Sequence, residues 1–469
     1  MAEPENYDLV IVGGGPGGYV AAVKAAQLKM KVACVEKASR LGGVCLRKGC
    51  IPSKALLDSS EYYHLAKEKF AAHGIKTGRV SVDLPTMMAR KEEVVKSLTD
   101  NVRSLLQRNK VEIIHGKAKL AGNGRVEVAG ENQSRTLQAG KILLATGSEP
   151  VSVPGLEFDG EHIVDSSGAL YFDAVPKALG VVGGGYIGLE LGSVWLRLGA
   201  KVTVIEMLPQ IAALLDGQVA RTLLRILKKQ GMEFHLTTRV AAAKVANKKV
   251  KVTVEKDDQK LTLTFDRLLV AVGRRPLTRG LNLEETGIRT DSKTGHIIVD
   301  ETFQTSVSGV YAIGDLIAGP ALAHKASAEG IAAVECMAGL PGEVNYDAVP
   351  AVIYTAPEVA SVGLTEEQVK ERKIPYCTGT YPFTGAGRAR CMGETDGFVK
   401  VISHQKTDRI LGVHIIGARA ADMIAEAVLA VEMGASAEDI ARTVHGHPTF
   451  AEALMEAAMS ASSCSIYSA

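Results

Sequence analysis

Short apolar runs that end in a glycine-rich turn recur along the first two thirds of the chain. Residues 7–36 read YDLVIVGGGPGGYVAAVKAAQLKMKVACVE, with an apolar run, a turn, a helical segment and a second apolar run at Lys31–Val35. Residues 178–206 read ALGVVGGGYIGLELGSVWLRLGAKVTVIE and repeat this order. Buried apolar runs that alternate with helical segments are typical of parallel α/β domains. The pattern therefore predicts two strand–helix–strand units of the same kind.

Further apolar runs follow each of the two units. KILLATGS at 141–148 and RLLVAVGRRP at 267–276 each predict a buried strand that ends in a glycine turn, and we expect each to close its domain. GVYAIGD at 309–315 predicts another strand, which delivers the carboxylate of Asp315 to a loop. ALAHKASAEG at 321–330 then begins a helix.

The pattern changes at about residue 347. GFVKVIS at 397–403 and RILGVHIIG at 409–417 alternate as strands do, and ADMIAEAVLAVEMG at 421–434 is an Ala-rich amphipathic helix. Strands followed by a helix of this kind predict a separate α+β domain at the C-terminal end.

Composition adds exclusions to this picture. The chain has 469 residues, too many for one hydrophobic core, and its 46% hydrophobic and 23% charged residues are typical of an ordinary globular protein. A net charge of +2 argues against an extended nucleic-acid or anionic-membrane surface. No apolar run reaches the roughly 18 residues that would cross a bilayer.

The N-terminus and the cysteines indicate a reducing compartment. MAEPENYDLV has neither a basic n-region nor an Arg-rich amphipathic start, so we expect no targeting segment. Seven cysteines are too few for a secreted disulfide framework. Five of them stand alone and are expected to be inert: Cys34, Cys336, Cys377, Cys391 and Cys464. We expect a cytoplasmic protein, and Met1 favours a bacterial cytoplasm over a mature mitochondrial matrix.

The two glycine-rich turns carry the same four residues 170 positions apart. These are Gly13, Gly15, Gly18 and Glu36 in the first copy, and Gly183, Gly185, Gly188 and Glu206 in the second. The glycines permit a tight turn and a close backbone approach to a pyrophosphate at a helix N-terminus, and the acid can bind a ribose diol. Two dinucleotide sites imply electron transfer between two cofactors. Glu206 is followed by Met207 and Leu208 rather than arginine, which favours NAD over NADP.

Cys45 and Cys50 stand five residues apart in GGVCLRKGCIPSK. A metal site would need a second cysteine pair or nearby histidines, which are lacking. A regular helix separates such Cα atoms by about 8.6 Å, beyond the roughly 7 Å that a disulfide tolerates, so we expect Gly49 and Pro52 to distort the backbone. Lys54 follows Cys50 by four residues, and its cation would lower the thiol pKa. The pair is predicted to be redox-active.

These motifs together resemble one family. GGVCLRKGCIPSK, both glycine fingerprints, YAIGD and the terminal HGHPTFAEA are similar, in order and along essentially the whole chain, to the flavoprotein disulfide reductases. The resemblance implies an α/β fold with two Rossmann-like domains, one for FAD and one for NAD, plus a C-terminal α+β dimerisation domain that forms a homodimer. It also implies a redox-active disulfide between Cys45 and Cys50.

The expected domain limits follow from these motifs. Residues 1–149 form an FAD-binding domain with the disulfide, 150–277 an NAD-binding domain, 278–346 a central segment that completes the FAD-binding domain, and 347–469 the interface domain.

The resemblance also implies roles for residues outside the fingerprints. His447 would serve as a general base for the partner subunit's disulfide, with Glu452 orienting it and a cis peptide before Pro448. Lys54, paired with Glu190, would stabilise the Cys50 thiolate. His445 is expected to be a solvated loop residue.

Further cofactor contacts are implied for both nucleotide sites. For FAD they are Lys54, Gly116, Thr146, Gly147, Ser148, Asp315, Ala321, Leu322, Ala323 and His324, and for NAD they are Val240 and Gly273. No metal is expected.

The pattern within the family is most similar to its lipoamide-acting branch. The expected reaction is the oxidation of protein-bound dihydrolipoamide, in which substrate thiolate attacks Cys45 and electrons pass from Cys50 through FAD to NAD⁺. The expected partners are lipoyl domains and the acyltransferase core of 2-oxoacid dehydrogenase complexes, or the lipoyl protein of glycine cleavage. Tyr186 and the stretch FTGAGRAR depart from this pattern, and a tyrosine at 186 resembles the nicotinamide-pocket lid of glutathione reductase.

Three alternatives remain for the activity. Mercuric reductase shares the cysteine pair but ends in a vicinal cysteine pair, whereas Cys464 is alone. Glutathione reductase would bind NADP, which Glu206 disfavours. A non-enzymatic flavin-bearing assembly subunit would not need His447 or the disulfide.

Overall fold

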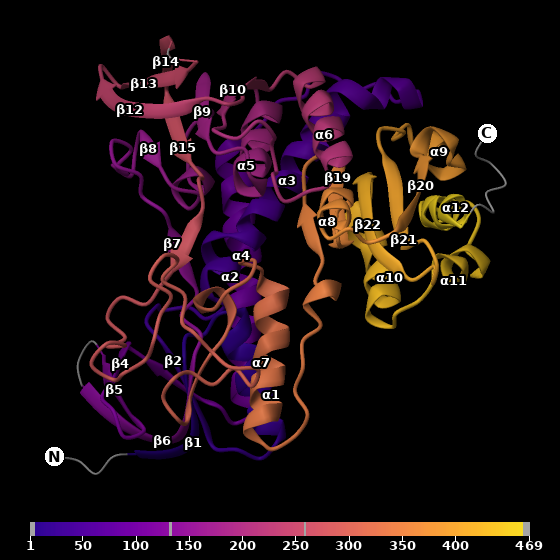
Figure 1. The fold of residues 1–469 in the computed structure, drawn as a ribbon. Helices are drawn as coiled ribbons and strands as arrows, with labels where there is room; N and C mark the ends of the chain where they lie inside the picture. The colour runs from indigo at the N-terminus through magenta and orange to yellow at the C-terminus, as the bar shows by residue number, and fades with distance from the viewer. Residues whose placement is uncertain (1–4, 131–133, 258, 463–469) are drawn as a thin grey trace. The chain divides into compact units, whose positions relative to one another are not determined.

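The computed structural model describes residues 5–130, 134–257 and 259–462, and Cys464 lies outside this part of the chain. The chain divides into two compact units, each assembled from separate segments (Figure 1). The first unit combines Met1–Leu56, Val82–Ser152 and Gly273–Val344, and the second combines Leu57–Ser81, Val153–Val272 and Asn345–Ala469. The domain limits expected from the sequence stay predictions.

The first unit is built on a largely parallel sheet. Its parallel strands are, in spatial order, β3 (Glu112–His115), β2 (Val32–Glu36), β1 (Glu5–Val12), β6 (Ser134–Leu144) and β17 (Val310–Ala312). β5 (Arg125–Ala129) pairs antiparallel with the start of β6, and β4 (Lys117–Leu120) pairs antiparallel with β5. Parallel pairing places the carboxyl ends of β1, β2 and β6 at one edge, where ligands bind in open α/β sheets.

Helices pack on this sheet through small residues. α1 (Pro16–Gln27) and α7 (Ala323–Met337) lie so close that a Cβ built on Gly330 would be 2.6 Å from the carbonyl oxygen of Gly17. α2 (Gly43–Lys48) is followed by α3 (Cys50–His64), and α4 (Leu84–Arg108) lies farther along the chain. The predicted first strand, helix and second strand are therefore present.

The second unit repeats the parallel arrangement. Its parallel sheet contains, in spatial order, β11 (Glu233–His235), β10 (Lys201–Ile205), β9 (Ala178–Val182), β15 (Arg267–Val270) and β8 (Ile163–Val164). Two helices, α5 (Tyr186–Arg197) and α6 (Gly217–Lys229), follow β9 and β10 in the chain. An antiparallel sheet of β12 (Arg239–Ala246), β13 (Lys249–Lys256) and β14 (Gln259–Phe265) is inserted before β15. The second strand–helix–strand prediction is also present.

The C-terminal segment of this unit forms an antiparallel sheet with helices. The strand order is β18 (Ala351–Ile353), β19 (Glu358–Gly363), β22 (Ile410–Gly417), β21 (Phe398–His404) and β20 (Tyr376–Pro382). The helices of this segment are α8 (Glu366–Glu371), α9 (Gly387–Met392), α10 (Ala420–Glu432), α11 (Ala437–Arg442) and α12 (Glu452–Ala461). The α+β character expected for residues beyond 347 is observed.

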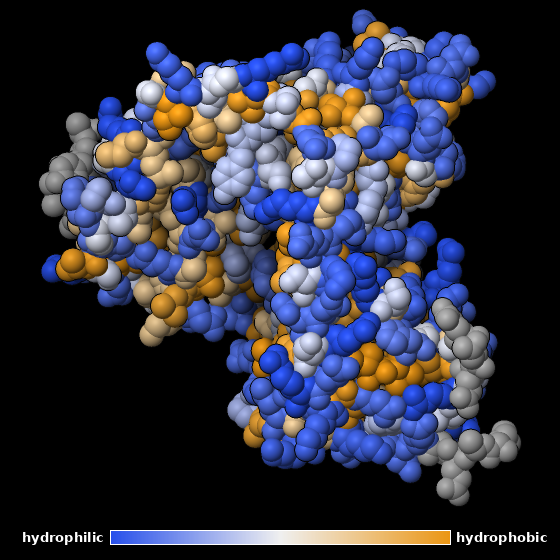
Figure 2. All heavy atoms as spheres, turned by 180° about the vertical axis from the view of Figure 1, so that it is seen from behind, coloured by the Kyte–Doolittle hydropathy of each residue, from blue (hydrophilic) through white to orange (hydrophobic). Residues whose placement is uncertain are grey.

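The molecular surface carries exposed apolar side chains among polar ones (Figure 2). Three large ones belong to the C-terminal segment: Leu429 and Met433 are 59% and 76% exposed, and Val444 is 96% exposed. Within the described residues, no helix combines the length and the apolar character that a membrane crossing requires.

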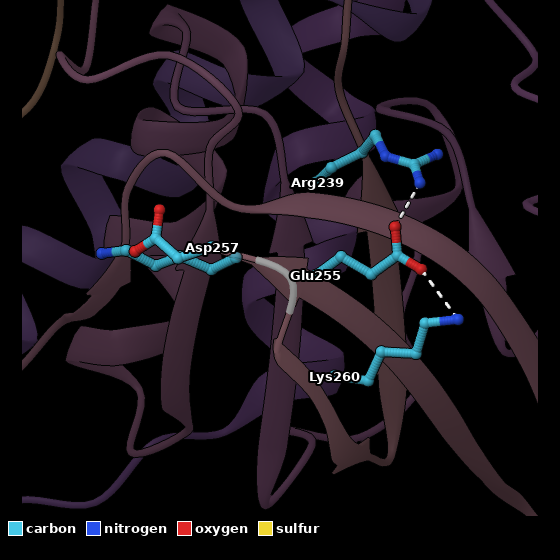
Figure 3. A pocket seen from close by; sticks show the side chains of 5 residues that line it. Arg239, Glu255, Asp257 and Lys260 are labelled. Atoms are coloured by element: carbon cyan, nitrogen blue, oxygen red, sulfur yellow. Dashed lines mark hydrogen bonds and ion pairs between the residues drawn. The ribbon is translucent and has the colours of Figure 1, made fainter.

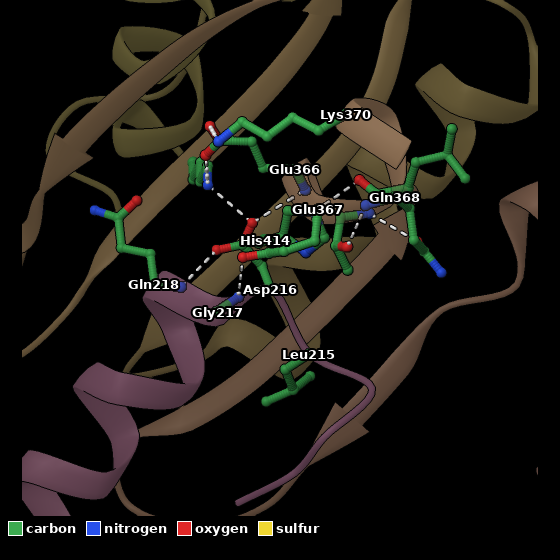
Figure 4. Close-up of polar contacts among 12 residues, drawn as sticks. Leu215, Asp216, Gly217, Gln218, Glu366, Glu367, Gln368, Lys370 and His414 are labelled. Atoms are coloured by element: carbon green, nitrogen blue, oxygen red, sulfur yellow. Dashed lines mark hydrogen bonds and ion pairs between the residues drawn. The ribbon is translucent and has the colours of Figure 1, made fainter. Parts of the chain in front are cut away.

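A buried charge cluster ties α6 to the C-terminal sheet within the second unit (Figure 4). Lys400 on β21 is 2% exposed, and its Nζ lies 2.8 Å from Asp216 Oδ2 and 2.6 Å from Glu366 Oε2. Asp216 also caps α6, because its Oδ1 accepts the Gln218 N–H at 3.0 Å. Hydrogen bonds from Lys370 and Lys400 outweigh burial and lower the pKa of Glu366 to about 2.

Replacing Glu366 with glutamine is expected to lower the free energy of unfolding at pH 7. The folded-state pKa of Glu366 is depressed from 4.5 to about 2, so the stabilisation is complete above about pH 4.5 and is lost as pH falls through about 2. The loss at pH 7 should be on the order of 3 kcal/mol. Urea unfolding of variant and wild type at pH 7 and pH 3 measures it, and the difference should shrink at pH 3.

Asp100→Asn is the control for this prediction. Asp100 and Lys96 form a pair at 2.7 Å with side chains 49% and 66% exposed, so removing this solvent-screened pair should change the free energy of unfolding far less than Glu366→Gln does. Equal losses in the two variants, or a Glu366 effect that does not change with pH, would contradict the assignment.

Candidate active site

The first glycine-rich turn forms a cradle that side chains would fill. Gly13 has a φ of +113°, and a Cβ built on it would lie 2.3 Å from the Ala145 carbonyl oxygen. A Cβ on Gly18 would lie 1.8 Å from the Gly13 carbonyl oxygen. α1 begins after Gly15 without a side-chain cap. Its first N–H groups can therefore bind phosphate, and the turn fits the pyrophosphate of FAD.

The second turn has the same geometry. Gly183 has a φ of +102°, and a Cβ there would lie 2.4 Å from the Ala271 carbonyl oxygen. A Cβ on Gly188 would lie 2.3 Å from the Gly183 carbonyl oxygen. α5 likewise begins after Gly185 without a side-chain cap. The turn fits the pyrophosphate of NAD in the same way.

Glu36 and Glu206 are held in matching orientations at the ends of their strands. Each carboxylate accepts two backbone N–H groups, one from the glycine turn and one from two residues downstream. The donors are Gly14 and Ala38 at 2.9 Å each in the first copy, and Gly184 at 2.6 Å and Leu208 at 2.7 Å in the second. These bonds fix the carboxylates beside the turns, where the sequence predicts the ribose contacts.

The structure brings several other predicted FAD residues together in the first unit. The Ser148 hydroxyl donates a hydrogen bond to Asp315, and the Gly116 N–H donates to the Glu36 carbonyl at 3.0 Å. Arg274, which the sequence did not single out, donates from Nε to Ser148 Oγ at 2.7 Å. The remaining predicted positions are placed as follows: Thr146 and Gly147 lie in the turn after β6, and Ala321, Leu322, Ala323 and His324 lie at the start of α7.

A buried ion pair beneath the Asp315 loop was also not predicted. Lys325 and Glu329 of α7 are 1% and 0% exposed and lie 2.8 Å apart. Glu329 Oε2 accepts the Gly314 N–H at 2.7 Å, and Lys325 Nζ donates to the Gly314 carbonyl at 3.3 Å. The pair fixes the loop that carries Asp315. The pattern KxxxE in ALAHKASAEG is its only sequence signal.

The cysteine pair straddles a break between two helices, and both cysteines belong to the first unit. α2 ends before Gly49, which has a φ of −142° and a ψ of −112°, and α3 begins at Cys50, so the predicted distortion is present. α2 also contacts the first glycine turn, because a Cβ on Gly43 would lie 2.6 Å from the Gly15 Cα. The structure brings the Cys45 and Cys50 side chains into hydrogen-bonding contact across this break.

The surroundings of the Cys45 thiol oppose its ionisation. The hydrogen bond with Cys50, then burial, then negative charge on Cys50 raise the pKa of the Cys45 thiol. The Lys54 ammonium acts in the opposite direction on Cys45, but it does not reverse the shift. The effect of Lys54 that the sequence predicts for the Cys50 thiol stays a prediction.

His447 and Glu452 are joined as expected in the second unit. His447 Nδ1 lies 2.8 Å from Glu452 Oε1, and Glu452 Oε2 accepts the Thr449 N–H at 2.7 Å. The His447–Pro448 peptide is cis, and the His447 side chain is 79% exposed. Burial alone would raise the pKa of Glu452, but the hydrogen bonds from His447 and Thr449 outweigh it and hold that pKa below its ordinary value.

The prediction that His445 is a solvated loop residue is wrong. Its side chain is only 6% exposed, and its Nε2 lies 2.8 Å from Glu426 Oε1. The local pattern HGH indicated a loop, and that part is correct. The burial comes from α10, which carries Glu426 and lies 19 residues earlier in the chain.

The structure shows where the remaining predicted residues lie, but their positions do not test the predicted roles. Glu190 on α5 is 3% exposed, and its Oε1 accepts the Tyr354 N–H at 2.9 Å, a contact that the sequence did not suggest. Its expected pairing with Lys54 stays a prediction. Tyr186, the first residue of α5, is 39% exposed. The other two predicted NAD contacts are Val240, on β12, and Gly273, which has a φ of +135°.

One surface pocket is lined by none of the predicted site residues. It has a volume of about 380 Å³ and lies on β12–β14 (Figure 3). Its lining residues are Arg239, Glu255, Lys256, Asp257 and Lys260. Glu255 hydrogen-bonds to Arg239 and pairs with Lys260 at 3.2 Å, so one carboxylate is shared by two cations. Among the described residues there is no group of three or more His, Cys, Asp or Glu that could hold a metal ion.

Two dinucleotide-binding turns and a cysteine pair packed against one of them define a two-cofactor thiol redox protein. The chain belongs to the pyridine nucleotide-disulphide oxidoreductases, whose family model matches residues 7–330 and whose dimerisation-domain model matches residues 349–458. The predicted family, fold class, homodimer and pair of cofactors, FAD and NAD, are thereby confirmed.

Relatives and solved structures extend the similarity along nearly the whole chain. A mitochondrial dihydrolipoyl dehydrogenase of Pisum sativum is 50% identical over 97% of this chain and 91% of that protein. A leghemoglobin reductase of Glycine max is also 50% identical, over 97% and 87%. The solved structure of LpdA from Mycobacterium tuberculosis is 27% identical, has a TM-score of 0.89 and covers 97% of this chain and 99% of that one. The HOCl-induced flavoprotein disulfide reductase RclA from Escherichia coli is 28% identical with a TM-score of 0.84, over 96% and 99%.

Gly185→Ala and Gly188→Ala are expected to separate cofactor binding from folding. Gly185 has ordinary extended φ and ψ, and no atom lies within 4 Å of its added Cβ. Gly185→Ala should therefore leave thermal unfolding unchanged and raise the KM for NAD⁺ about tenfold or more, which is the loss of roughly one phosphate hydrogen bond.

Gly188→Ala should instead lower the unfolding temperature, because its Cβ meets the Gly183 carbonyl at 2.3 Å. Thermal scans and NAD⁺ titrations measure the two effects. Equal destabilisation by both variants, or an unchanged KM in Gly185→Ala, would contradict the assignment.

Proposed function

We propose that the protein is an NAD-dependent dihydrolipoyl dehydrogenase that oxidises protein-bound dihydrolipoamide to lipoamide. The observation that carries the substrate assignment is the 50% identity, over 97% of the chain, to several proteins named dihydrolipoyl dehydrogenase. The same degree of identity to leghemoglobin reductases makes their activity an outcome to be tested. The cysteine pair and the His447–Glu452 pair supply the groups that the chemistry requires.

The first half of the reaction is a thiol–disulfide exchange. The partner subunit's His447 accepts a proton from one thiol of dihydrolipoamide, and the resulting thiolate attacks Cys45 Sγ of the Cys45–Cys50 disulfide. The S–S bond breaks, and Cys50 leaves as a thiolate. The second substrate thiolate then attacks the substrate sulfur of the mixed disulfide, so that lipoamide forms and Cys45 takes up a proton.

The second half returns the cysteines to the disulfide. The products of the first half are a protonated Cys45 and a negatively charged Cys50, and the raised pKa of the Cys45 thiol favours this arrangement. Lys54 and Glu190 would stabilise the thiolate. FAD would be held by the first glycine turn, Glu36, Ser148 and Asp315. It would carry the two electrons that the re-forming disulfide gives up, together with the Cys45 proton, to NAD⁺ at the second turn.

His447 suits the role of base because of its surroundings. The Glu452 carboxylate fixes the tautomer and the orientation of the ring, and its own depressed pKa keeps this carboxylate ionised at neutral pH. The exposed ring is open to a partner subunit, and the family's dimerisation domain covers this segment.

The proposal extends to partners and location. The lipoyl substrate would be carried by lipoyl domains of 2-oxoacid dehydrogenase complexes, with their acyltransferase core, or by the lipoyl protein of glycine cleavage. We place the protein in a cytoplasm, although its relatives are named mitochondrial.

The deciding experiment is an NADH-formation assay with dihydrolipoamide and NAD⁺ on purified protein. We expect turnover with NAD⁺ to exceed that with NADP⁺ by about tenfold or more, because the Glu206 carboxylate would repel a 2′-phosphate. NADPH with glutathione disulfide, NADPH with mercuric ion, and NADH with ferric leghemoglobin are parallel arms. Faster turnover in any of these arms would replace the proposed substrate, and inactivity in all of them would support the non-enzymatic alternative.

His447→Gln is expected to lower dihydrolipoamide turnover by about 10² or more, as general-base losses of about 10²–10⁴ suggest. Stopped-flow reduction of bound FAD by NADH should stay at the wild-type rate, because that step does not use His447. The absorbance of the bound FAD is the folding control.

A heterodimer of His447→Gln and Cys45→Ser subunits should regain turnover, since one composite site in it is intact. Each parent homodimer alone should remain inactive. A verified heterodimer without activity would contradict catalysis across the subunit boundary.

A further inference from the structure

His445 is held at both ring nitrogens, two residues before His447. Its Nδ1 lies 2.8 Å from the Thr443 carbonyl oxygen, and its Nε2 lies 2.8 Å from Glu426 Oε1. The ring is on the loop between α11 and α12, and Glu426 is on α10. The His445 side chain is 6% exposed, whereas that of His447 is 79% exposed.

Both partners of this ring are hydrogen-bond acceptors. A carbonyl oxygen and an ionised carboxylate cannot donate, and a neutral imidazole has a single N–H. Both contacts are made only when a further proton lies between Nε2 and Glu426, whichever of the two groups carries it. An unshared pair would place lone pairs against each other at 2.8 Å in a largely buried site.

The same loop carries the catalytic pair. Glu452, the first residue of α12, binds His447. Its carboxylate also faces His445, since positive charge on His445 contributes to lowering the pKa of Glu452. The groups facing the ring are therefore Glu426 from α10, Glu452 from α12 and His447 from its own loop. Charge on His445 and the orientation of His447 are coupled through this carboxylate.

We propose that His445 is a positioning residue for the reaction proposed above: it shares a proton with Glu426 and thereby fastens residues 443–449 to α10. The shared proton fixes the loop at its first turn, and Glu452 fixes it at its end. His447 is thereby held in one orientation although its ring is exposed. The inference rests on the proposed function for its effect on turnover, and on the hydrogen-bond geometry for the shared proton.

Substitution of Glu426 distinguishes the shared proton from packing. In Glu426→Gln the amide N–H can donate to an unprotonated His445 Nε2, while Nδ1–H still donates to Thr443. This variant keeps both contacts without the additional proton. Glu426→Ala removes the contact, and so does His445→Ala.

Steady-state kinetics with dihydrolipoamide give the first readout. We expect Glu426→Ala and His445→Ala to lower kcat about tenfold, a loss of orientation rather than of the base itself, with KM for NAD⁺ and FAD reduction by NADH unchanged. Glu426→Gln should retain kcat at neutral pH. At alkaline pH it should lose less activity than wild type, because its contact does not depend on a proton that is lost as pH rises.

Glu438→Gln is the matched control on α11. Glu438 pairs with Arg442 at 2.6 Å, and their side chains are 54% and 79% exposed. The Glu438→Gln substitution therefore removes one negative charge near the same loop, as Glu426→Gln does, without changing a partner of His445. It should leave kcat and its pH profile as in wild type. The proposal is overturned when Glu426→Gln loses as much kcat as Glu426→Ala at every pH, or when Glu438→Gln reproduces the change in profile.

Hydrogen–deuterium exchange at the C2 position of each histidine, read by mass spectrometry across pH, gives a readout that needs no substrate. The midpoint of the His445 exchange curve should differ between Glu426→Gln and wild type, because the additional proton is no longer shared between the ring and residue 426. An unchanged midpoint overturns the shared proton even when lipoamide turnover is normal. A shifted midpoint in a protein without lipoamide turnover would instead keep the shared proton and reject the proposed function.

Discussion

Helix and strand approach each other so closely after each glycine-rich turn that a side-chain carbon cannot fit between them. A Cβ added to Gly18 would lie 1.8 Å from the Gly13 carbonyl oxygen, and one added to Gly188 would lie 2.3 Å from the Gly183 carbonyl oxygen. This contact aims an uncapped helix N-terminus at the ends of the parallel strands. In the first unit, α2 rests on the same turn through Gly43, so the position of Cys45 depends on the turn as well. Cofactor binding and thiol chemistry thus share one backbone constraint.

The sequence predicts those features whose partners lie near in the chain. The glycine turns and their acids fall within one strand–helix–strand unit, and the helix break at Gly49 follows from the five-residue spacing of the cysteines. His447 and Glu452 are five residues apart, and their pairing needed only the family pattern. All of these features depend on residues that are close together in the chain, so the sequence pattern is sufficient to predict them.

Three features that the sequence missed depend on distant segments. Arg274 reaches Ser148 across 126 positions, and the Glu190 carboxylate meets the Tyr354 backbone across 164. His445 has the sequence surroundings of an exposed loop residue, and only the position of α10 buries it. Hydrophobic periodicity predicts which face of an element is buried, but it does not predict which polar group from another element will meet that face.

The order in which the segments are synthesised has a consequence for biogenesis. The first unit requires β17 and α7, which lie beyond residue 309, whereas residues 153–272 belong to the other unit and are complete earlier. Domains fold as units while the chain emerges from the ribosome. The first sheet must therefore wait, with β1, β2 and β6 already made, until about two thirds of the protein has been translated. A nascent chain that stops after residue 272 would carry the first glycine turn and the thiols of Cys45 and Cys50 without the strand and helix that complete their surroundings.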